Sequence, residues 1–114
     1  MIGRLHAAAG RRVVGSGPTL ACCNGVGVST FFFKYIAEHF RDRFSVLLWD
    51  YRGHGRSASV EDPEQADLSI ESTAGDLHRV LEAAGLPGPA VLVGHSMGCQ
   101  VILEFARQRP EQVR

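Results

Sequence analysis

The residues best suited to chemistry in this 114-residue chain form the pentapeptide Gly94-His95-Ser96-Met97-Gly98. The apolar residues 91–93 precede it, and residues with helical periodicity follow it. A serine between two glycines at this spacing is typical of a sharp strand-to-helix turn, whose strained backbone holds the serine Oγ clear of the sheet. The pattern therefore predicts that Ser96 is a catalytic nucleophile. The alternative is a tight turn with a purely structural role.

A serine that attacks an acyl carbon needs hydrogen-bond donors for the oxyanion that forms. The helix expected after Ser96 directs its N-terminal amides toward the site, so we expect the amide of Met97 to be one donor. The loop Asn24-Gly25-Val26-Gly27 follows an apolar run, and its glycines let the backbone approach a substrate closely. We expect the amide of Val26 to be the second donor, with an ordinary strand-to-helix turn as the alternative for this loop.

Three continuous apolar runs, at residues 19–23, 44–49 and 90–93, predict buried β-strands that would position these residues. The sequence also allows a short strand at residues 11–14, which the turn-forming residues 15–18 would end. Because the three runs are continuous rather than alternating, we expect both faces of the sheet to be covered, as they are in parallel sheets.

Apolar residues at helical spacing predict helices over residues 30–40, 70–84 and 97–108. The residues expected to cap or stop them are Ser29 or Thr30, Ser69, Gly85 and Pro87. The residues expected to form the apolar faces are Phe32, Phe33, Ile36, Ala37 and Phe40, then Ile70, Ala74, Leu77, Leu81 and Ala84, and finally Val101, Ile102 and Phe105. Strands that alternate with helices predict a single α/β domain over residues 1–114, with a mostly parallel sheet flanked by helices.

The composition argues against several classes of partner. Lys+Arg and Asp+Glu are both 12, so the net charge is zero and nothing suggests a nucleic acid or a membrane surface. No apolar run approaches the roughly 18 residues that span a bilayer, and residues 5–10 are too short for a signal sequence. We therefore expect a cytoplasmic protein. Its oligomeric state is left open.

The cysteines do not point to a disulfide framework or a metal site. There are three of them, Cys22, Cys23 and Cys99, and none has a partner at the spacing of a zinc ligand pair. We expect all three to be small buried hydrophobic residues. No metal or organic cofactor is expected.

Three motifs together resemble the serine branch of the α/β-hydrolase superfamily over roughly residues 14–114. They are Cys23-Asn24-Gly25-Val26, Asp50-Tyr51-Arg52-Gly53-His54-Gly55-Arg56-Ser57 and the pentapeptide 94–98. The resemblance implies the N-terminal half of that fold and a serine esterase that acts on a small-molecule carboxylic ester or related acyl compound. It also implies a hydrolase without metal or cofactor. Ser rather than Asp at position 96 argues against the epoxide-hydrolase and dehalogenase branches.

The chain departs from the family pattern in two ways. Asn24-Gly25 stands where the family often has His-Gly, and we expect Asn24 to hydrogen-bond within its loop. The resemblance also implies a catalytic Asp, a catalytic His and a lid in later segments, none of which is present. The chain therefore resembles the N-terminal part of a longer fold, with residues 110–113 leading toward a further strand.

Several other polar residues of the chain could in principle replace the absent Asp and His. We expect His54 to stabilise its loop, His95 to point away from Ser96, Asp50 to fix the loop after it, and Asp76 to be solvated or to cap a helix. Arg52 and Arg56 are expected to form salt bridges within their loop, with an anionic substrate as the alternative. His6, His39 and His78 are expected at the surface or on helices. Two further readings of the whole chain stay open: an inactive fragment or binding module, and an acyltransferase or thioesterase.

We predict negligible esterase activity for the 114 residues alone, because without a base and its orienting acid only the oxyanion donors and binding remain. Those effects are worth about 10³–10⁴ over water in a well-formed site. The measurement is hydrolysis of an activated ester by the purified chain. Robust turnover that His54→Ala abolishes would contradict this expectation and identify His54 as the base.

Overall fold

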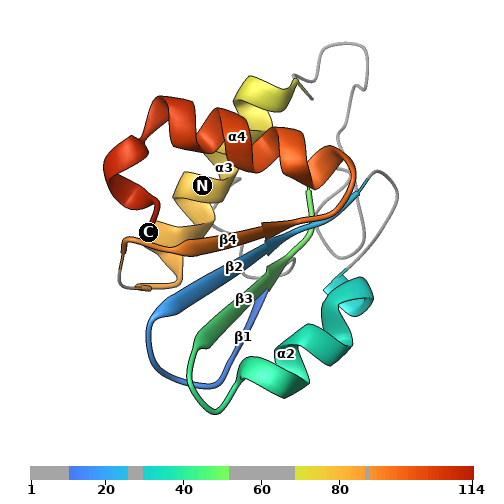
Figure 1. Ribbon diagram of the computed structural model, residues 1–114. Helices are drawn as coiled ribbons and strands as arrows, with labels where there is room; N and C mark the ends of the chain where they lie inside the picture. Colours follow the sequence, from blue (N-terminus) through green and yellow to red (C-terminus); the bar gives the residue numbers. More distant parts are fainter. Residues whose placement is uncertain (1–10, 26–29, 52–68, 87) are drawn as a thin grey trace.

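The computed structural model describes residues 11–25, 30–51, 69–86 and 88–114. Strands and helices alternate along the chain, as the apolar pattern predicts (Figure 1). The elements are β1 (Arg11–Val14), β2 (Thr19–Cys23), the 3₁₀ turn η1 (Thr30–Phe33), α2 (Lys34–Phe40), β3 (Ser45–Trp49), α3 (Ile70–Ala83), β4 (Val91–Gly94), α4 (Met97–Gln108) and the 3₁₀ turn η2 (Pro110–Gln112).

The four described strands form one mixed sheet in the order β1-β3-β2-β4. β2 pairs in parallel with both β3 and β4, whereas β1 pairs antiparallel with β3 at the edge. The predicted mostly parallel sheet is confirmed, and so is the short strand at residues 11–14. Every residue of β2 and β3 is buried, because α3 and α4 cover one face of the sheet and α2 covers the other (Figure 1).

The core consists of two apolar clusters, one on each face of the sheet. Successive strand residues point to opposite faces, so each strand contributes to both clusters. The first cluster is built under α3 and α4 from Ala21, Cys23, Leu47, Trp49, Tyr51, Ala74, Leu77, Val80, Leu81, Val101 and Phe105. The second is built against α2 from Leu20, Cys22, Phe33, Ala37, Val46 and Leu48.

The first helix begins differently from the prediction. Residues 30–33 form a 3₁₀ turn, and Phe33, not Ser29 or Thr30, occupies the N-cap position of α2, without a side-chain cap. Short 3₁₀ turns are common at the start of α-helices, and their tighter winding changes which side chains face the core. As a result Phe33 is buried, whereas Phe32 is 47% exposed, so the predicted place of Phe32 on the apolar face is wrong.

The second and third helices follow the prediction closely. The Ser69 hydroxyl caps α3 by accepting a hydrogen bond from the Ser72 amide at 3.1 Å, and α3 ends two residues before Gly85. α4 spans the predicted residues 97–108. Pro87 and Ser29 lie outside the described residues.

The chain after α4 returns to the edge of β4. Ala90 and Val113 form a parallel bridge, in which the Ala90 amide donates to Gln112 O and the Arg114 amide donates to Ala90 O, both at 2.9 Å. The bridge is isolated, and residues 110–112 form the 3₁₀ turn η2, so the further strand toward which residues 110–113 were expected to lead stays a prediction.

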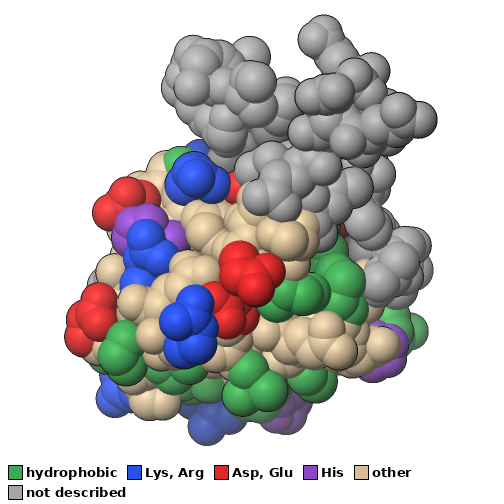
Figure 2. Space-filling view, turned by 90° about the horizontal axis from the view of Figure 1, so that it is seen from above, with side chains coloured by type: hydrophobic (Ala, Val, Ile, Leu, Met, Phe, Trp, Pro, Cys, Tyr) green, Lys and Arg blue, Asp and Glu red, His purple; other side chains and the backbone are tan. Residues whose placement is uncertain are grey.

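Charged side chains are mixed by sign on the described surface. Arg79 pairs with Asp76 and Arg107 with Glu104, each at 2.6 Å along its own helix. Figure 2 shows acidic and basic groups side by side on the face that it presents. Among the described helices, none is long and apolar enough to cross a membrane.

We predict that Phe105→Ala lowers the free energy of unfolding by about 3–5 kcal/mol, because removing a fully buried ring leaves a cavity in the first cluster. The matched control is Leu103→Ala, on the same helix but 71% exposed, which should change that free energy by less than about 0.5 kcal/mol. Urea titrations of the two variants make the comparison. Equal losses in both would contradict the assigned packing of α4.

Candidate active site

Ser96 lies in the two-residue turn between β4 and α4, in a strained backbone conformation. Its φ is 54° and its ψ is −117°, and it is the non-glycine residue with positive φ among those that the structure describes. Such a conformation costs on the order of 1–3 kcal/mol and persists only where the surroundings enforce it. The side chain is exposed. The geometry is the strand-to-helix turn that the pentapeptide predicts.

Close backbone contacts require glycine at both positions that flank Ser96, Gly94 and Gly98. A Cβ added at Gly94 would lie 2.7 Å from the Gly98 carbonyl carbon and 2.8 Å from the Cys99 amide nitrogen. A Cβ added at Gly98 would overlap the carbonyl oxygen of Cys23 on the neighbouring strand. Both positions therefore exclude every side chain, because the obstacles are backbone atoms that cannot rotate away.

The carboxyl ends of the parallel strands bring three short segments to one edge of the sheet. The amide of His95 donates to Cys23 O at 3.0 Å, which ties the turn to the end of β2. The residues that follow β2 then lie against the turn: a Cβ at Gly25 would be 3.1 Å from His95 Nδ1 and 3.3 Å from Ser96 Cβ. The start of the predicted oxyanion loop and the predicted nucleophile are thus in contact.

Asn24 links the end of β2 to the end of β3. It is fully buried, and its side-chain Nδ2 donates to Trp49 O at 3.0 Å. Its own carbonyl accepts a hydrogen bond from the Tyr51 hydroxyl at 2.5 Å. Both contacts run across to the adjacent strand and the residues after it, whereas the rest of the loop within which Asn24 was expected to bond, residues 26–29, lies outside the described residues. Within the described part of the chain, Asn24 Oδ1 is buried without a hydrogen-bond partner.

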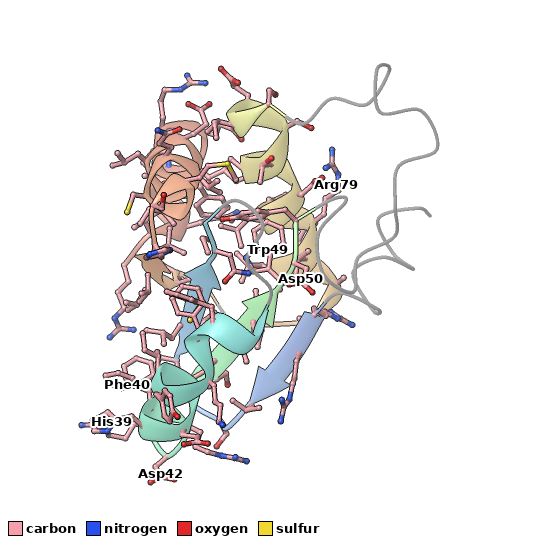
Figure 3. The ribbon with its side chains drawn as sticks, turned by 90° about the vertical axis from the view of Figure 1, so that its right-hand side faces the viewer. His39, Phe40, Asp42, Trp49, Asp50 and Arg79 are labelled. Carbon is pink, nitrogen blue, oxygen red and sulfur yellow. The ribbon has the colours of Figure 1, made fainter. Side chains whose placement is uncertain are left out.

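Trp49, the last residue of β3, and the next two residues, Asp50 and Tyr51, lie at the same edge of the sheet. Trp49 and Asp50 are at the opposite end of the sheet from His39 and Asp42 (Figure 3). Asp50 is 3% exposed, and the loop that it was expected to fix lies outside the described residues. The Trp49 and Tyr51 rings meet edge-to-face with centroids 5.0 Å apart, and burial raises the pKa of the Tyr51 phenol well above its ordinary value.

His95 is exposed, and its ring lies against Phe32, with the ring centroids 4.4 Å apart. Phe32 in turn meets Phe33 edge-to-face at 5.2 Å. The imidazole of His95, next to Ser96 in the sequence, therefore packs on Phe32 of the 3₁₀ turn η1. Sequence reasoning missed this contact because Phe32 was assigned to the helix face that packs on the sheet.

The two predicted oxyanion donors stay predictions, and the structure describes one of them, Met97. Met97 is the first residue of α4, and an amide at that position has no carbonyl one turn earlier in the helix to bond. The next amides bond backward, Gly98 to His95 O and Cys99 to Ser96 O, both at 2.9 Å. Val26 lies outside the described residues, so its place as the second donor stays a prediction.

The other candidates for a catalytic His or Asp that the structure describes each make contacts of their own, away from Ser96. His78, on α3, places Nδ1 3.2 Å from Gln112 Oε1 and Nε2 3.4 Å from Glu82 Oε2, and Asp76 accepts a hydrogen bond from Arg79 at 2.6 Å. His39 is exposed on α2. The candidates outside the described residues are His6, Arg52, His54 and Arg56.

The three cysteines are free. Cys22 and Cys23 are buried as expected, and burial raises the pKa of each thiol to about 12. The expectation for Cys99 is wrong: it is exposed at the start of α4, where its thiol donates to Gly94 O at 3.5 Å. In the first turn of α4 it is the preceding residue, Gly98, whose backbone lies against the end of β2. In the described ranges, no three His, Cys, Asp or Glu side chains are grouped to hold a metal ion.

Comparisons with known proteins agree on the fold. Residues 18–114 match the family model described as alpha/beta hydrolase fold. A pimeloyl-[acyl-carrier protein] methyl ester esterase of Methylococcus capsulatus is 39% identical over 99 residues, which are 87% of this chain and 35% of the esterase.

Solved structures give the same result. A marine microorganism esterase superposes with a TM-score of 0.81 at 34% identity and covers 91% of this chain and 38% of its own. A structure titled putative epoxide hydrolase from Pseudomonas aeruginosa has a TM-score of 0.82 at 31% identity, with 90% and 34% covered. The chain thus spans about a third of the length of these relatives.

We predict that Gly98→Ala lowers the free energy of unfolding by about 3 kcal/mol, because the added methyl group meets the Cys23 carbonyl. Gly75→Ala, in the middle of α3, is the matched control: its nearest neighbour would be Arg79 Nη1 at 3.8 Å. That substitution should stabilise the protein by about 0.5–1 kcal/mol through the helix propensity of alanine. Urea unfolding measures both, and a Gly98→Ala variant as stable as Gly75→Ala would contradict the tight contact of α4 with β2.

Proposed function

Because the chain belongs to the α/β-hydrolase fold family, we propose that it carries the nucleophile and oxyanion-binding elements of a serine hydrolase. The substrate class that we propose is small-molecule carboxylic esters or related acyl compounds. The observation that carries the proposal is the strained, exposed Ser96, held at φ 54° between a strand and a helix N-terminus. A strained backbone that the packing over-determines is characteristic of functional positions.

In the proposed reaction, Ser96 Oγ attacks the acyl carbon while its proton passes to a general base. The carbonyl oxygen becomes an oxyanion, which the amide of Met97 stabilises at the N-terminus of α4, together with the amide of Val26. The alcohol leaves with the proton from the base, and the acyl group remains on Ser96. Water, deprotonated by the same base, then releases the carboxylic acid and regenerates the serine.

We place the general base and its orienting carboxylate outside the described residues. The imidazole nearest in sequence, His95, is stacked on Phe32 at 4.4 Å, and His78 is engaged by Gln112 and Glu82. The relatives are about two and a half times as long as this chain, which leaves room in a whole protein of this family for the remaining catalytic groups.

The nucleophile type supports acyl chemistry over epoxide opening. A carboxylate that opens an epoxide forms an ester, which water can hydrolyse, whereas a serine hydroxyl would form an ether that water does not cleave. Ser96 therefore fits esters better than epoxides, although three of the similar solved structures are titled putative epoxide hydrolase. Two relatives named esterases support the same substrate class.

The charge and the thiols support the remaining parts of the proposal. The formal net charge is zero, which favours a small-molecule substrate over a nucleic acid or an anionic membrane surface. Three free cysteines favour a reducing compartment, and we place the reaction in the cytoplasm.

The test is labelling with a fluorophosphonate probe of the protein expressed from its complete open reading frame. We expect one adduct, on Ser96, and its loss in Ser96→Ala together with a fall in ester hydrolysis of about 10⁶-fold, as for removal of the serine in a serine protease. Ser16→Ala, an exposed serine between β1 and β2, is the matched control and should label normally. Undiminished labelling of Ser96→Ala would overturn the proposal.

A further inference from the structure

We propose that Asn24 and Tyr51 form a buried lock that positions the Asn24–Gly25 peptide against Ser96. This inference rests on the proposed function and adds two positioning residues to it. Neither residue touches the reacting atoms, and both act through the backbone of β2. We call the pair, with its two hydrogen bonds, the Asn24–Tyr51 lock.

The lock joins the ends of two strands through one residue. Asn24 donates from Nδ2 to Trp49 O at 3.0 Å and accepts at its main-chain carbonyl from the Tyr51 hydroxyl at 2.5 Å. Asn24 is 0% exposed, and Trp49 and Tyr51 are each 2% exposed. Hydrogen bonds in such surroundings are stronger than in water, and a partner left unpaired there is costly.

The two bonds fix the orientation of one peptide plane. In a trans peptide the carbonyl and the following amide point in opposite directions, so holding the Asn24 carbonyl also holds the amide of Gly25. That plane touches both sides of the turn. A Cβ at Gly98 would lie 3.0 Å from Asn24 O, and a Cβ at Gly25 would lie 3.3 Å from Ser96 Cβ. Rotation of the plane would therefore displace the backbone that adjoins Ser96.

The residue types suit a lock that does not titrate. Burial raises the pKa of the Tyr51 phenol well above its ordinary value, so the hydroxyl is protonated and can donate its hydrogen bond at neutral pH. The Asn24 amide carries no charge at any pH. Its Oδ1 is buried without a partner within the described residues, so the side chain acts here through its donor. A carboxylate at this position would face Trp49 O without a proton to donate.

The test compares Tyr51→Phe with Tyr35→Phe in the protein expressed from its complete open reading frame. Both changes remove one phenolic oxygen, but Tyr35 is 74% exposed on α2, whereas Tyr51 is buried and bonded to Asn24. The first measurement is the reaction of Ser96 with a fluorophosphonate probe, separated into probe affinity and maximal acylation rate. The second is amide hydrogen exchange of the peptide that contains residues 94–98.

We expect Tyr51→Phe to lower the maximal acylation rate about 10–100-fold with probe affinity within about twofold, because small misplacements of catalytic groups cost rate rather than binding. We also expect faster exchange across residues 94–98. Tyr35→Phe should match the original protein in both measurements. Thermal unfolding of each variant selects a temperature at which all of them are folded.

An unchanged acylation rate in folded Tyr51→Phe would overturn the lock, even if that variant melts at a lower temperature, since the bond would then serve stability alone. If the original protein does not label at Ser96, the proposed function fails, and the exchange measurement decides the lock by itself. Exchange of residues 94–98 equal in Tyr51→Phe and Tyr35→Phe would then reject it, and faster exchange in Tyr51→Phe alone would support it.

Discussion

The close approach of α4 to the end of β2 is the constraint on which the rest of this structure depends. At Gly98 the helix backbone lies directly against the Cys23 carbonyl, with no space for a side chain. The same carbonyl accepts a hydrogen bond from the His95 amide at 3.0 Å. One backbone group of β2 therefore hydrogen-bonds the residue after β4 and contacts the first turn of α4. The chain must reverse from strand to helix within this distance, and the positive φ of Ser96 is the result.

The strain at Ser96 is small compared with the packing that enforces it. A non-glycine residue in such a conformation costs about 1–3 kcal/mol, whereas burying one large side chain contributes about 1.5–3 kcal/mol. α4 is held by the fully buried Val101 and Phe105, and β4 is held in register with β2 over four residue pairs. This packing of α4 and β4 on either side of Ser96 holds the strained conformation in place.

The sequence was sufficient for the elements whose pattern is local. Continuous apolar runs located β2, β3 and β4, and helical spacing together with the Ser69 cap located α3 and α4. Features that depend on tertiary contacts were not predictable. Because residues 30–33 form a 3₁₀ turn rather than an α-helical turn, Phe32 contacts the His95 ring instead of packing in the core. Cys99, in the first turn of α4, is exposed rather than buried.

The candidate site also combines features that the local sequence predicts with features that depend on contacts between residues far apart in the chain. The Gly-x-Ser-x-Gly spacing was enough to predict the turn at Ser96, because the need for residues without a Cβ at positions 94 and 98 shows in five consecutive residues. The bonds of Asn24 join residues 25 and 27 positions apart, and no pattern in the chain marks Tyr51 as a donor to β2. Val26 and His54 lie outside the described residues, so their roles stay predictions.

The two ends of the sheet serve different purposes, and the direction of β1 explains why. Since β1 runs antiparallel to β3, the turn from β1 to β2 lies at the end of the sheet where β2 and β3 begin. There the Ser45 amide donates to Pro18 O at 2.8 Å and its hydroxyl donates to Gly17 O at 2.9 Å, which closes that end. The segments after β2, β3 and β4 all leave from the other end, because parallel strands share the edge at which they finish. A short antiparallel edge strand thus stabilises the inner strands without adding a loop at the edge where Ser96 is exposed.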